Sequence, residues 1–219
     1  MSAGIVGIYK PKGPTSHDII DQLRRITGVQ RIGHAGTLDP LAEGVLVVGI
    51  GRDATKQLDE AVQKEKEYEA TITLGAESTT DDAQGELRTV PISRIPARDE
   101  VERAALQFTG EIEQLPPQYS SVKVGGKPAH RRVRRGESVT LGPRQVTVKN
   151  IAMESYSWPQ LKLRVVTGPG VYMRSLARDI GRALGVGGYL SALIRMRVGE
   201  YSASTALTVE QFSERFRTA

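Results

Sequence analysis

A carboxylate stands at the centre of a glycine-rich stretch, residues 33–44, which reads GHAGTLDPLAEG. Asp39 precedes Pro40, and a residue before proline is biased away from the helical region, so we expect Asp39 in a turn or loop. A carboxylate presented in this way could act as a nucleophile or as a base, and His34 lies in the same stretch. Asp-Pro pairs are also common in ordinary turns, so the motif alone leaves a purely structural Asp39 open.

Tyr68 and Arg174 are the other side chains whose placement could serve chemistry. Tyr68 begins the stretch 68–74, in which alternate residues are apolar, as in a half-buried strand; a core tyrosine with a hydroxyl partner is the simpler interpretation. Arg174 lies in the first turn of a helix that we expect to follow a glycine-rich turn and to end at Leu184. Because helix N-termini favour anions, Arg174 needs a carboxylate or phosphate partner there.

The elements around these side chains can be placed from periodicity and capping signals. Thr15 and Asp18 match a capping box, which predicts a helix that begins there and ends at Gly28. We expect a long polar loop over 76–96. Strands are expected at 4–9, 45–50, 68–74, 145–152, 160–167 and 190–198, and further helices at 53–62, 99–108 and 208–216. This order lacks a βαβ rhythm and indicates an α+β fold with a largely antiparallel sheet.

Composition narrows the classes of function. The chain has 219 residues, no cysteine, and three histidines too far apart to suggest a metal site. We therefore expect no metal and no cofactor. No apolar run of about 18 residues and no export signal occur, so we expect a cytoplasmic protein without a membrane span.

The charge pattern favours a polyanionic partner. The formal net charge is +5, and residues 123–135 hold six lysines and arginines and no acidic residue. Aromatic residues make up only 5% of the chain, which argues against an extended base-stacking platform. Arg24, Arg25 and Arg31 could contact phosphates, although a solvated basic face is the commoner explanation.

Four separated segments, in this order and spacing, closely resemble the TruB family of tRNA pseudouridine synthases. They are KPKG at 10–13, GHAGTLDPLA at 33–42, KEY at 66–68 and GVYMR at 170–174. The resemblance implies the pseudouridine-synthase fold, with a mixed, mostly antiparallel sheet, flanking helices and a central catalytic cleft. It also implies the substrate, the uridine at position 55 in the T loop of tRNA, and one catalytic domain over residues 1–219 without the C-terminal PUA-type domain common in the family.

The resemblance also implies roles for individual residues. Asp39 would be the catalytic carboxylate, paired with Arg174, and Tyr68 would lie against the target base and handle the proton at C5. Tyr172 and Leu193 would line the uridine pocket. The remaining substrate contacts would come from His34, which would enter the T loop, and from Lys10 and Lys12 beside the cleft.

The same family implies how the RNA is held. Segments 76–96 and 123–136 would be RNA-facing loops or insertions, and we expect the protein to act as a monomer on the T stem-loop. The phosphates would be bound by basic side chains from two regions, Arg24, Arg25, Arg31, Lys123, Lys127, Arg131, Arg132 and Arg134.

Some alternatives remain open from the sequence. Asp39 could attack C1′ of the sugar, attack C6 of the base or remove the C2′ proton. A guide-RNA-dependent pseudouridine synthase shares the catalytic loop, and a tRNA-folding chaperone without catalysis would share the basic surface. An intact set of Asp39, Tyr68 and Arg174 argues against the chaperone, because a binding protein has no need of a buried carboxylate.

Overall fold

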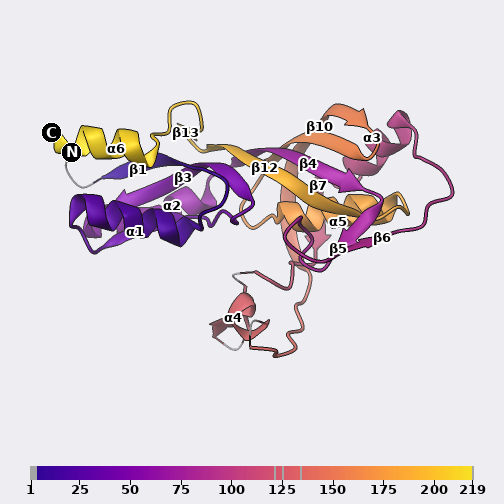
Figure 1. Cartoon of the computed structure of the whole chain (residues 1–219), viewed down its shortest axis with the longest axis horizontal. Helices are drawn as coiled ribbons and strands as arrows, with labels where there is room; N and C mark the ends of the chain where they lie inside the picture. Colours follow the sequence, from indigo (N-terminus) through magenta and orange to yellow (C-terminus); the bar gives the residue numbers. More distant parts are fainter. Residues whose placement is uncertain (1–3, 121, 125, 134, 219) are drawn as a thin grey trace. The chain divides into compact units, whose positions relative to one another are not determined.

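The computed structural model describes residues 4–120, 122–124, 126–133 and 135–218. Its α-helices and β-strands follow one another as β1 (Ile5–Lys10), α1 (Ser16–Thr27), β2 (Ile32–Ala35), β3 (Ala42–Ile50), α2 (Arg52–Gln63), β4 (Lys66–Leu74), β5 (Ala76–Ser78), β6 (Leu87–Thr89), α3 (Arg98–Leu106), β7 (Gly110–Gln114), β8 (Lys123–Val124), β9 (Lys127–Pro128), α4 (Ala129–Val133), β10 (Arg144–Ser157), β11 (Gln160–Thr167), α5 (Met173–Ala183), β12 (Gly188–Val198), β13 (Tyr201–Ser202) and α6 (Val209–Arg217) (Figure 1). The helices and strands expected from the sequence are all present, and the fold is α+β.

The chain forms two compact units. The first holds residues 1–69 and 193–219, and the second holds residues 70–192, so that β4 and β12 each begin in one unit and end in the other. The expectation of one catalytic domain over residues 1–219 stays a prediction.

In the first unit, β3 is the central strand. It pairs antiparallel with β1 and β2 and parallel with β12, which makes the sheet mixed. Leu46 and Val48 pack with α1 and α6, whereas Val45 and Val47 pack with α2. Because β3 is covered on both faces, its sequence is an unbroken apolar run rather than an alternating one. Helix α6 runs alongside β1 (Figure 1).

Helix α1 begins and ends where its sequence predicts. Thr15 accepts a hydrogen bond from the backbone of Asp18, whose carboxylate accepts from the Thr15 backbone, so the capping box is formed. Gly28 closes the helix in the left-handed conformation, with φ of 71°. The N-terminus of α1 lies beside the loop that carries Asp39, because Ser16 is hydrogen-bonded to Leu38.

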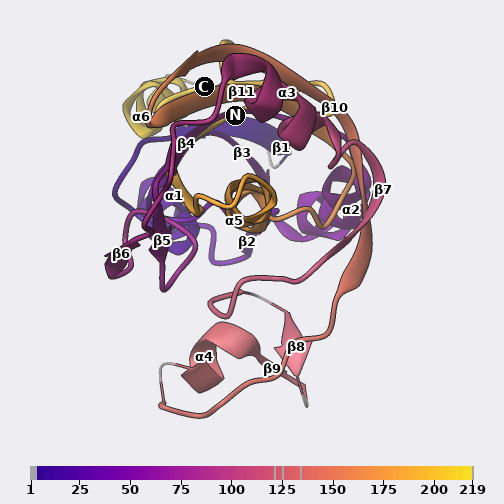
Figure 2. The ribbon, with the colours of Figure 1, turned by 90° about the vertical axis from the view of Figure 1, so that its right-hand side faces the viewer.

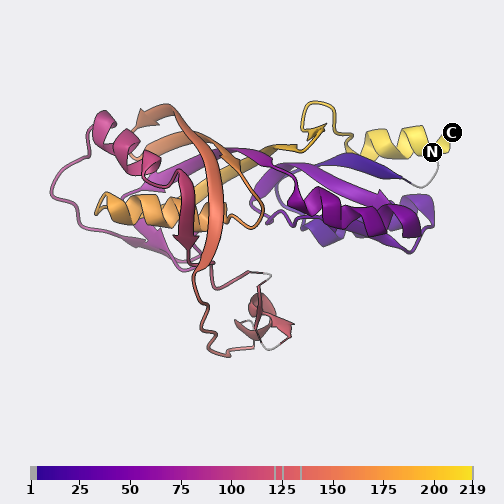
Figure 3. The ribbon, with the colours of Figure 1, turned by 180° about the vertical axis from the view of Figure 1, so that it is seen from behind.

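In the second unit, the strand order is β4-β11-β10-β7, and the pairs β11–β10 and β10–β7 are antiparallel. Helix α5 lies within the curve of these strands (Figure 2), and its residues Leu176, Ala177 and Ile180 are fully buried. The hairpin β8–β9 and helix α4 form a small extension between β7 and β10 (Figure 3). Val122, Ala129, Val139 and Leu141 form its own apolar cluster.

The long loop expected over 76–96 is wrong in part. Its ends pair as the antiparallel hairpin β5–β6, in which Ala76 faces Thr89. Hydroxyl groups replace apolar packing here: Ser78 donates to the carbonyl of Asp82, and Thr79 accepts from the backbone of Glu86. Such side-chain bonds to the backbone order a polar segment that hydrophobic periodicity cannot reveal.

Candidate active site

The loop that carries Asp39 joins β2 to β3 and is fixed by bonds to its backbone. The Ser16 hydroxyl, which is buried, donates to the Leu38 carbonyl at 3.0 Å and accepts from the Leu38 N–H at 2.8 Å. The N–H of Gly13 donates to the Pro40 carbonyl at 2.8 Å. Two segments from the N-terminal part of the chain therefore hold the residues on either side of Asp39, whose side chain is half-buried.

Lys10 lies fully buried at the end of β1. Its ammonium donates to the carbonyls of Pro11 at 2.9 Å and Pro14 at 2.8 Å, so it orders the basic turn that follows. Burial lowers the pKa of Lys10 to about 8, and the negative charges of Asp39 and Glu43 act in the opposite direction. Lys10 is therefore a structural cation within the field of Asp39, whereas Lys12 is exposed.

Tyr68 is linked to the Asp39 loop by an arginine that the sequence analysis missed. Tyr68 is 6% exposed. Burial lowers the pKa of Arg195 in β12, and the Tyr68 hydroxyl lies close enough to that guanidinium to oppose the larger effect of burial. The same guanidinium donates to the Gly36 carbonyl at 3.0 Å and to the Val45 carbonyl at 2.8 Å. The available signal was the pair Arg195 and Arg197 within an otherwise strand-like run, residues 190–198.

Leu193 and His34 lie on strands that border this loop. Leu193 is buried and pairs in register with Ala42. His34 is half-buried in β2, and its Nδ1 atom is buried without a hydrogen-bond partner among the described residues. Burial, with a smaller effect of the Arg195 charge, lowers the pKa of His34 to about 4, so the ring is neutral at pH 7.

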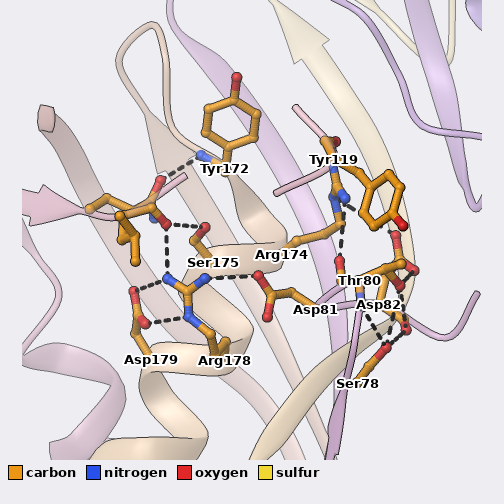
Figure 4. A network of polar contacts seen from close by, with 12 residues as sticks. Ser78, Thr80, Asp81, Asp82, Tyr119, Tyr172, Arg174, Ser175, Arg178 and Asp179 are labelled. Atoms are coloured by element: carbon orange, nitrogen blue, oxygen red, sulfur yellow. Dashed lines mark hydrogen bonds and ion pairs between the residues drawn. The ribbon is translucent and has the colours of Figure 1, made fainter. Parts of the chain in front are cut away.

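Arg174 belongs to the second unit, where it has a carboxylate near the start of α5, as its position in the helix requires (Figure 4). Its Nε atom lies 3.8 Å from Asp82 Oδ2, and both side chains are buried. Arg174 also donates to the carbonyls of Tyr119 at 2.9 Å and Thr80 at 3.3 Å. The guanidinium therefore joins α5 to the turn after β5 and to the segment after β7.

Arg178, one helical turn further along α5, makes a second and tighter cluster (Figure 4). It donates to Asp81 at 2.8 Å, to Asp179 at 2.9 Å and to the Leu115 carbonyl at 2.9 Å. Burial raises the pKa of Asp81, and Arg178 opposes that shift. Asp81 has a φ of 60°, uncommon for a residue other than glycine, which indicates that its neighbours hold it in place.

Tyr172 precedes α5 and is half-buried. Its backbone N–H donates to the Gln114 side chain at 2.7 Å, which replaces a local helix cap. Tyr172 packs against the apolar cluster of the α4 extension, which includes Val122 and Leu141. The predicted uridine-pocket residue is therefore in contact with the predicted RNA-facing insertion.

The predicted phosphate-binding residues fall into two groups. Arg25 and Arg31 are exposed, whereas Arg24 is engaged with Asp21 at 2.8 Å and with the Gln30 carbonyl at 3.1 Å, so Arg24 has a structural use. In the second unit, Lys123 lies in β8, Lys127 in β9, and Arg131 and Arg132 in α4, and Arg132 pairs with Glu137 at 2.6 Å. Arg134 lies outside the described residues.

The structure thus brings together Asp39, Lys10, Tyr68 and Leu193 in the first unit, with Arg195 added. Arg174 and Tyr172 belong to the second unit, so their contacts with Asp39 and with the uridine stay predictions. Asp81, Asp82 and Arg178 were missed as well. The only signals for them were the adjacent acids at 81 and 82 and the four-residue spacing of Arg174, Arg178 and Arg182.

Among the described residues, no cluster of three or more histidine or acidic side chains could hold a metal ion. In the same part of the chain, no helix is both long and apolar enough to cross a membrane.

Comparison with protein families gives matches along most of the chain. The model described as "TruB family pseudouridylate synthase (N terminal domain)" matches residues 24–173. The model described as "tRNA pseudouridylate synthase B C-terminal domain" matches residues 174–219. The two matches are contiguous.

Similar proteins carry related names. A protein of Thermobifida fusca named tRNA pseudouridine synthase B is 47% identical over 99% of this chain and 76% of its own length. One of Leifsonia xyli with the same name is 47% identical over 94% of this chain and 70% of its own length.

Solved structures show the same fold at lower identity. A Cbf5-Nop10-Gar1 complex contains a chain that is 30% identical with a TM-score of 0.72, over 96% of this chain and 54% of that one. A second structure, of an H/ACA RNP bound to a substrate RNA containing 2′-deoxyuridine, gives 28% identity and a TM-score of 0.70, over 96% and 52%. The chain spans about half the length of these solved chains.

Proposed function

The chain belongs to the TruB family of pseudouridylate synthases, and on that premise we propose that it converts uridine to pseudouridine in the T loop of tRNA. One observation carries the proposal: the Asp39 loop is fixed on both sides of a half-buried carboxylate, and Arg195 ties it to the buried hydroxyl of Tyr68. The resemblance assigns the chemistry to Asp39 and Tyr68. The name tRNA pseudouridine synthase B, carried by relatives that are 47% identical, supports tRNA as the RNA concerned.

The reaction needs no external reactant. The N1–C1′ bond of uridine breaks, the uracil turns, and a C5–C1′ bond forms; C5 loses a proton and N1 gains one. An ionised Asp39 would begin this sequence as a nucleophile or as a base. Tyr68 would take part in removing the C5 proton. Leu193 and Tyr172 would lie against the uracil ring.

The target nucleotide would leave its stack before it reacts. Extruding a base costs a few kcal/mol, and stacking on a protein side chain regains about 1–3 kcal/mol per base. A neutral His34 suits this replacement, because an uncharged ring loses little hydration when it stacks. The exposed Arg25 and Arg31 and the basic α4 extension would supply salt-dependent phosphate contacts. A monomeric, cytoplasmic enzyme remains part of this proposal.

A guide-RNA-dependent synthase is the second candidate, because chains of the Cbf5-Nop10-Gar1 complex and of the H/ACA RNP share the fold. Identity favours the tRNA enzyme, at 47% against 28–30%. Incubation of the purified protein alone with an unmodified tRNA transcript separates the two.

The decisive experiment uses two transcripts, a T-arm stem-loop and the same stem-loop with cytidine at the target position. Carbodiimide treatment followed by reverse transcription maps pseudouridine as a stop. We expect a stop at position 55 in the first transcript and none in the second. Modification only when a guide RNA and partner proteins are added would reject the tRNA-specific proposal.

A further inference from the structure

Arg195 is an arginine buried in the first unit that makes no ion pair with a carboxylate among the described residues. Its side chain is 1% exposed. Its contacts are the carbonyls of Gly36 and Val45 and the side chain of Tyr68. Burying a guanidinium without a carboxylate is costly, and an aliphatic side chain could fill such a space more cheaply. The position therefore calls for an explanation beyond packing.

We propose that Arg195 is a positioning residue for the pseudouridine-forming reaction, which fixes the Tyr68 hydroxyl relative to the loop that carries Asp39. The inference rests on the proposed function, because that function assigns the chemistry to Asp39 and Tyr68. Arg195 itself would touch no substrate. It acts by setting the geometry of two side chains that do.

The contacts of Arg195 explain how it could do this. Guanidinium is planar and presents five N–H donors in a rigid fork, so three acceptors on three segments are held in one fixed arrangement. Val45 belongs to β3, Gly36 to the Asp39 loop and Tyr68 to β4. One side chain thereby links the strand behind the loop, the loop and the tyrosine.

The guanidinium also restricts how the Tyr68 hydroxyl can be used. Guanidinium has no acceptor, so toward Arg195 the Tyr68 oxygen can only accept, and its own O–H must donate elsewhere. A group that handles a proton needs this control, because small misplacements cost large factors in rate.

Two glycines keep Arg195 close to the loop. A Cβ at Gly44 would overlap the Arg195 carbonyl oxygen, so glycine is needed for β3 and β12 to approach here. Gly36 has a φ of 82°, and a Cβ on it would lie 3.5 Å from Arg195 Nη1. Both glycines belong to the motif that carries Asp39; Gly44 is required by the close approach of Arg195, and Gly36 by its positive φ.

The test compares Arg195→Lys and Arg195→Met with Arg197→Lys and Arg197→Met. Arg197 lies on the same strand, but it is half-buried and pairs with Glu65 and Glu67. For both Arg195 variants we expect the single-turnover rate to fall about 10²-fold, with the Kd for tRNA within threefold. Lysine keeps the positive charge but should leave the rate as low as methionine does, because one ammonium cannot reproduce the fork. The Arg197 variants should keep the wild-type rate.

A spectroscopic measurement on the RNA-free protein tests the contact itself. In protein labelled with ¹³Cζ-tyrosine, the Tyr68 signal is identified by its loss in Tyr68→Phe. The chemical shift of this signal should change in Arg195→Lys and remain at its wild-type value in Arg197→Lys. In Tyr68→Phe, which keeps Arg195, the Arg195 Nε–H signal should move in turn, so this half of the test remains if the Arg195 variants do not fold.

The outcomes are separable from the proposed function. The inference would be overturned by a Tyr68 chemical shift that is unchanged in Arg195→Lys, or by an Arg195 chemical shift that is unchanged in Tyr68→Phe. A rate in the Arg195 variants that falls only in proportion to tRNA affinity would also overturn it. If the wild-type protein modifies no tRNA, the proposed function fails, while the spectroscopic result still decides whether Arg195 holds Tyr68.

Discussion

The two units bury arginine in different ways. Arg195 in the first unit is surrounded by two carbonyls and a phenol oxygen, whereas Arg174 and Arg178 in the second unit lie against aspartates. Neutral acceptors hold a guanidinium mainly through directional hydrogen bonds, because they attract the charge less strongly than a carboxylate does. Arg195 is therefore suited to fix geometry, and the aspartate-paired arginines are suited to balance charge.

The second unit contains a further contrast between its own arginines. Arg178 lies 2.8 Å from Asp81, but the Nε atom of Arg174 lies 3.8 Å from Asp82. A longer, less directional ion pair is more easily exchanged for another anion. Arg178 should therefore remain with its aspartates, and the pairing of Arg174 with Asp39 stays a prediction.

Asp39→Asn should have the largest effect, because it removes the only group in the first unit that is proposed to start the reaction. We expect a loss of about 10³-fold or more in the single-turnover rate, with tRNA affinity within a few-fold. Rates are measured on a T-arm transcript and affinity by filter binding. A variant that keeps the normal rate would remove Asp39 from the mechanism.

Arg174→Lys should come next, with a loss of about 10²-fold in rate, because lysine cannot donate two parallel hydrogen bonds to a carboxylate. A double-mutant cycle with Asp39→Asn, measured by the free energy of unfolding, should give a coupling of about 1 kcal/mol. Additive effects would reject the pairing of Asp39 with Arg174 and leave Asp82 as the relevant carboxylate.

Arg178→Met should mainly affect stability. Removing one partner of a buried ion pair leaves Asp81 and Asp179 uncompensated, which we expect to lower the free energy of unfolding by about 3 kcal/mol. The matched control is Arg182→Met, since Arg182 lies on the same helix but is 59% exposed and should change stability by less than about 0.5 kcal/mol. Equal losses in urea denaturation would contradict a special role for the Arg178 cluster.

His34 should give the smallest effect, visible as a dependence of stability on pH. Its pKa falls from 6.5 to about 4 on folding, chiefly through burial. Between these values the unfolded chain binds a proton that the folded protein does not, so stability falls as the pH drops from 6.5 to 4. His34→Gln should remove up to about 2 kcal/mol of this loss in denaturation curves recorded over that range. Parallel losses in both proteins would show that His34 is not the cause.

Much of the fold could be predicted because its signals are local. Capping groups defined α1, alternation defined β4 with Tyr68 facing inward, and an unbroken apolar run defined β3. The hairpin β5–β6 could not be predicted in this way, because hydroxyl and carboxylate bonds order it rather than an apolar face.

The candidate site divides along the same line. Residue type and neighbouring glycine and proline determined by themselves that Asp39 lies in a loop before a buried strand, and that Arg174 needs an anion at the start of its helix. Only the tertiary structure decided that Arg195 contacts both Tyr68 and Gly36, which lies 159 residues before Arg195 in the chain. The same holds for the position of Asp82 beside Arg174. Local signals report the conformation of a segment and the needs of a side chain. Which distant group meets those needs depends on how the strands pair, and no local pattern records that.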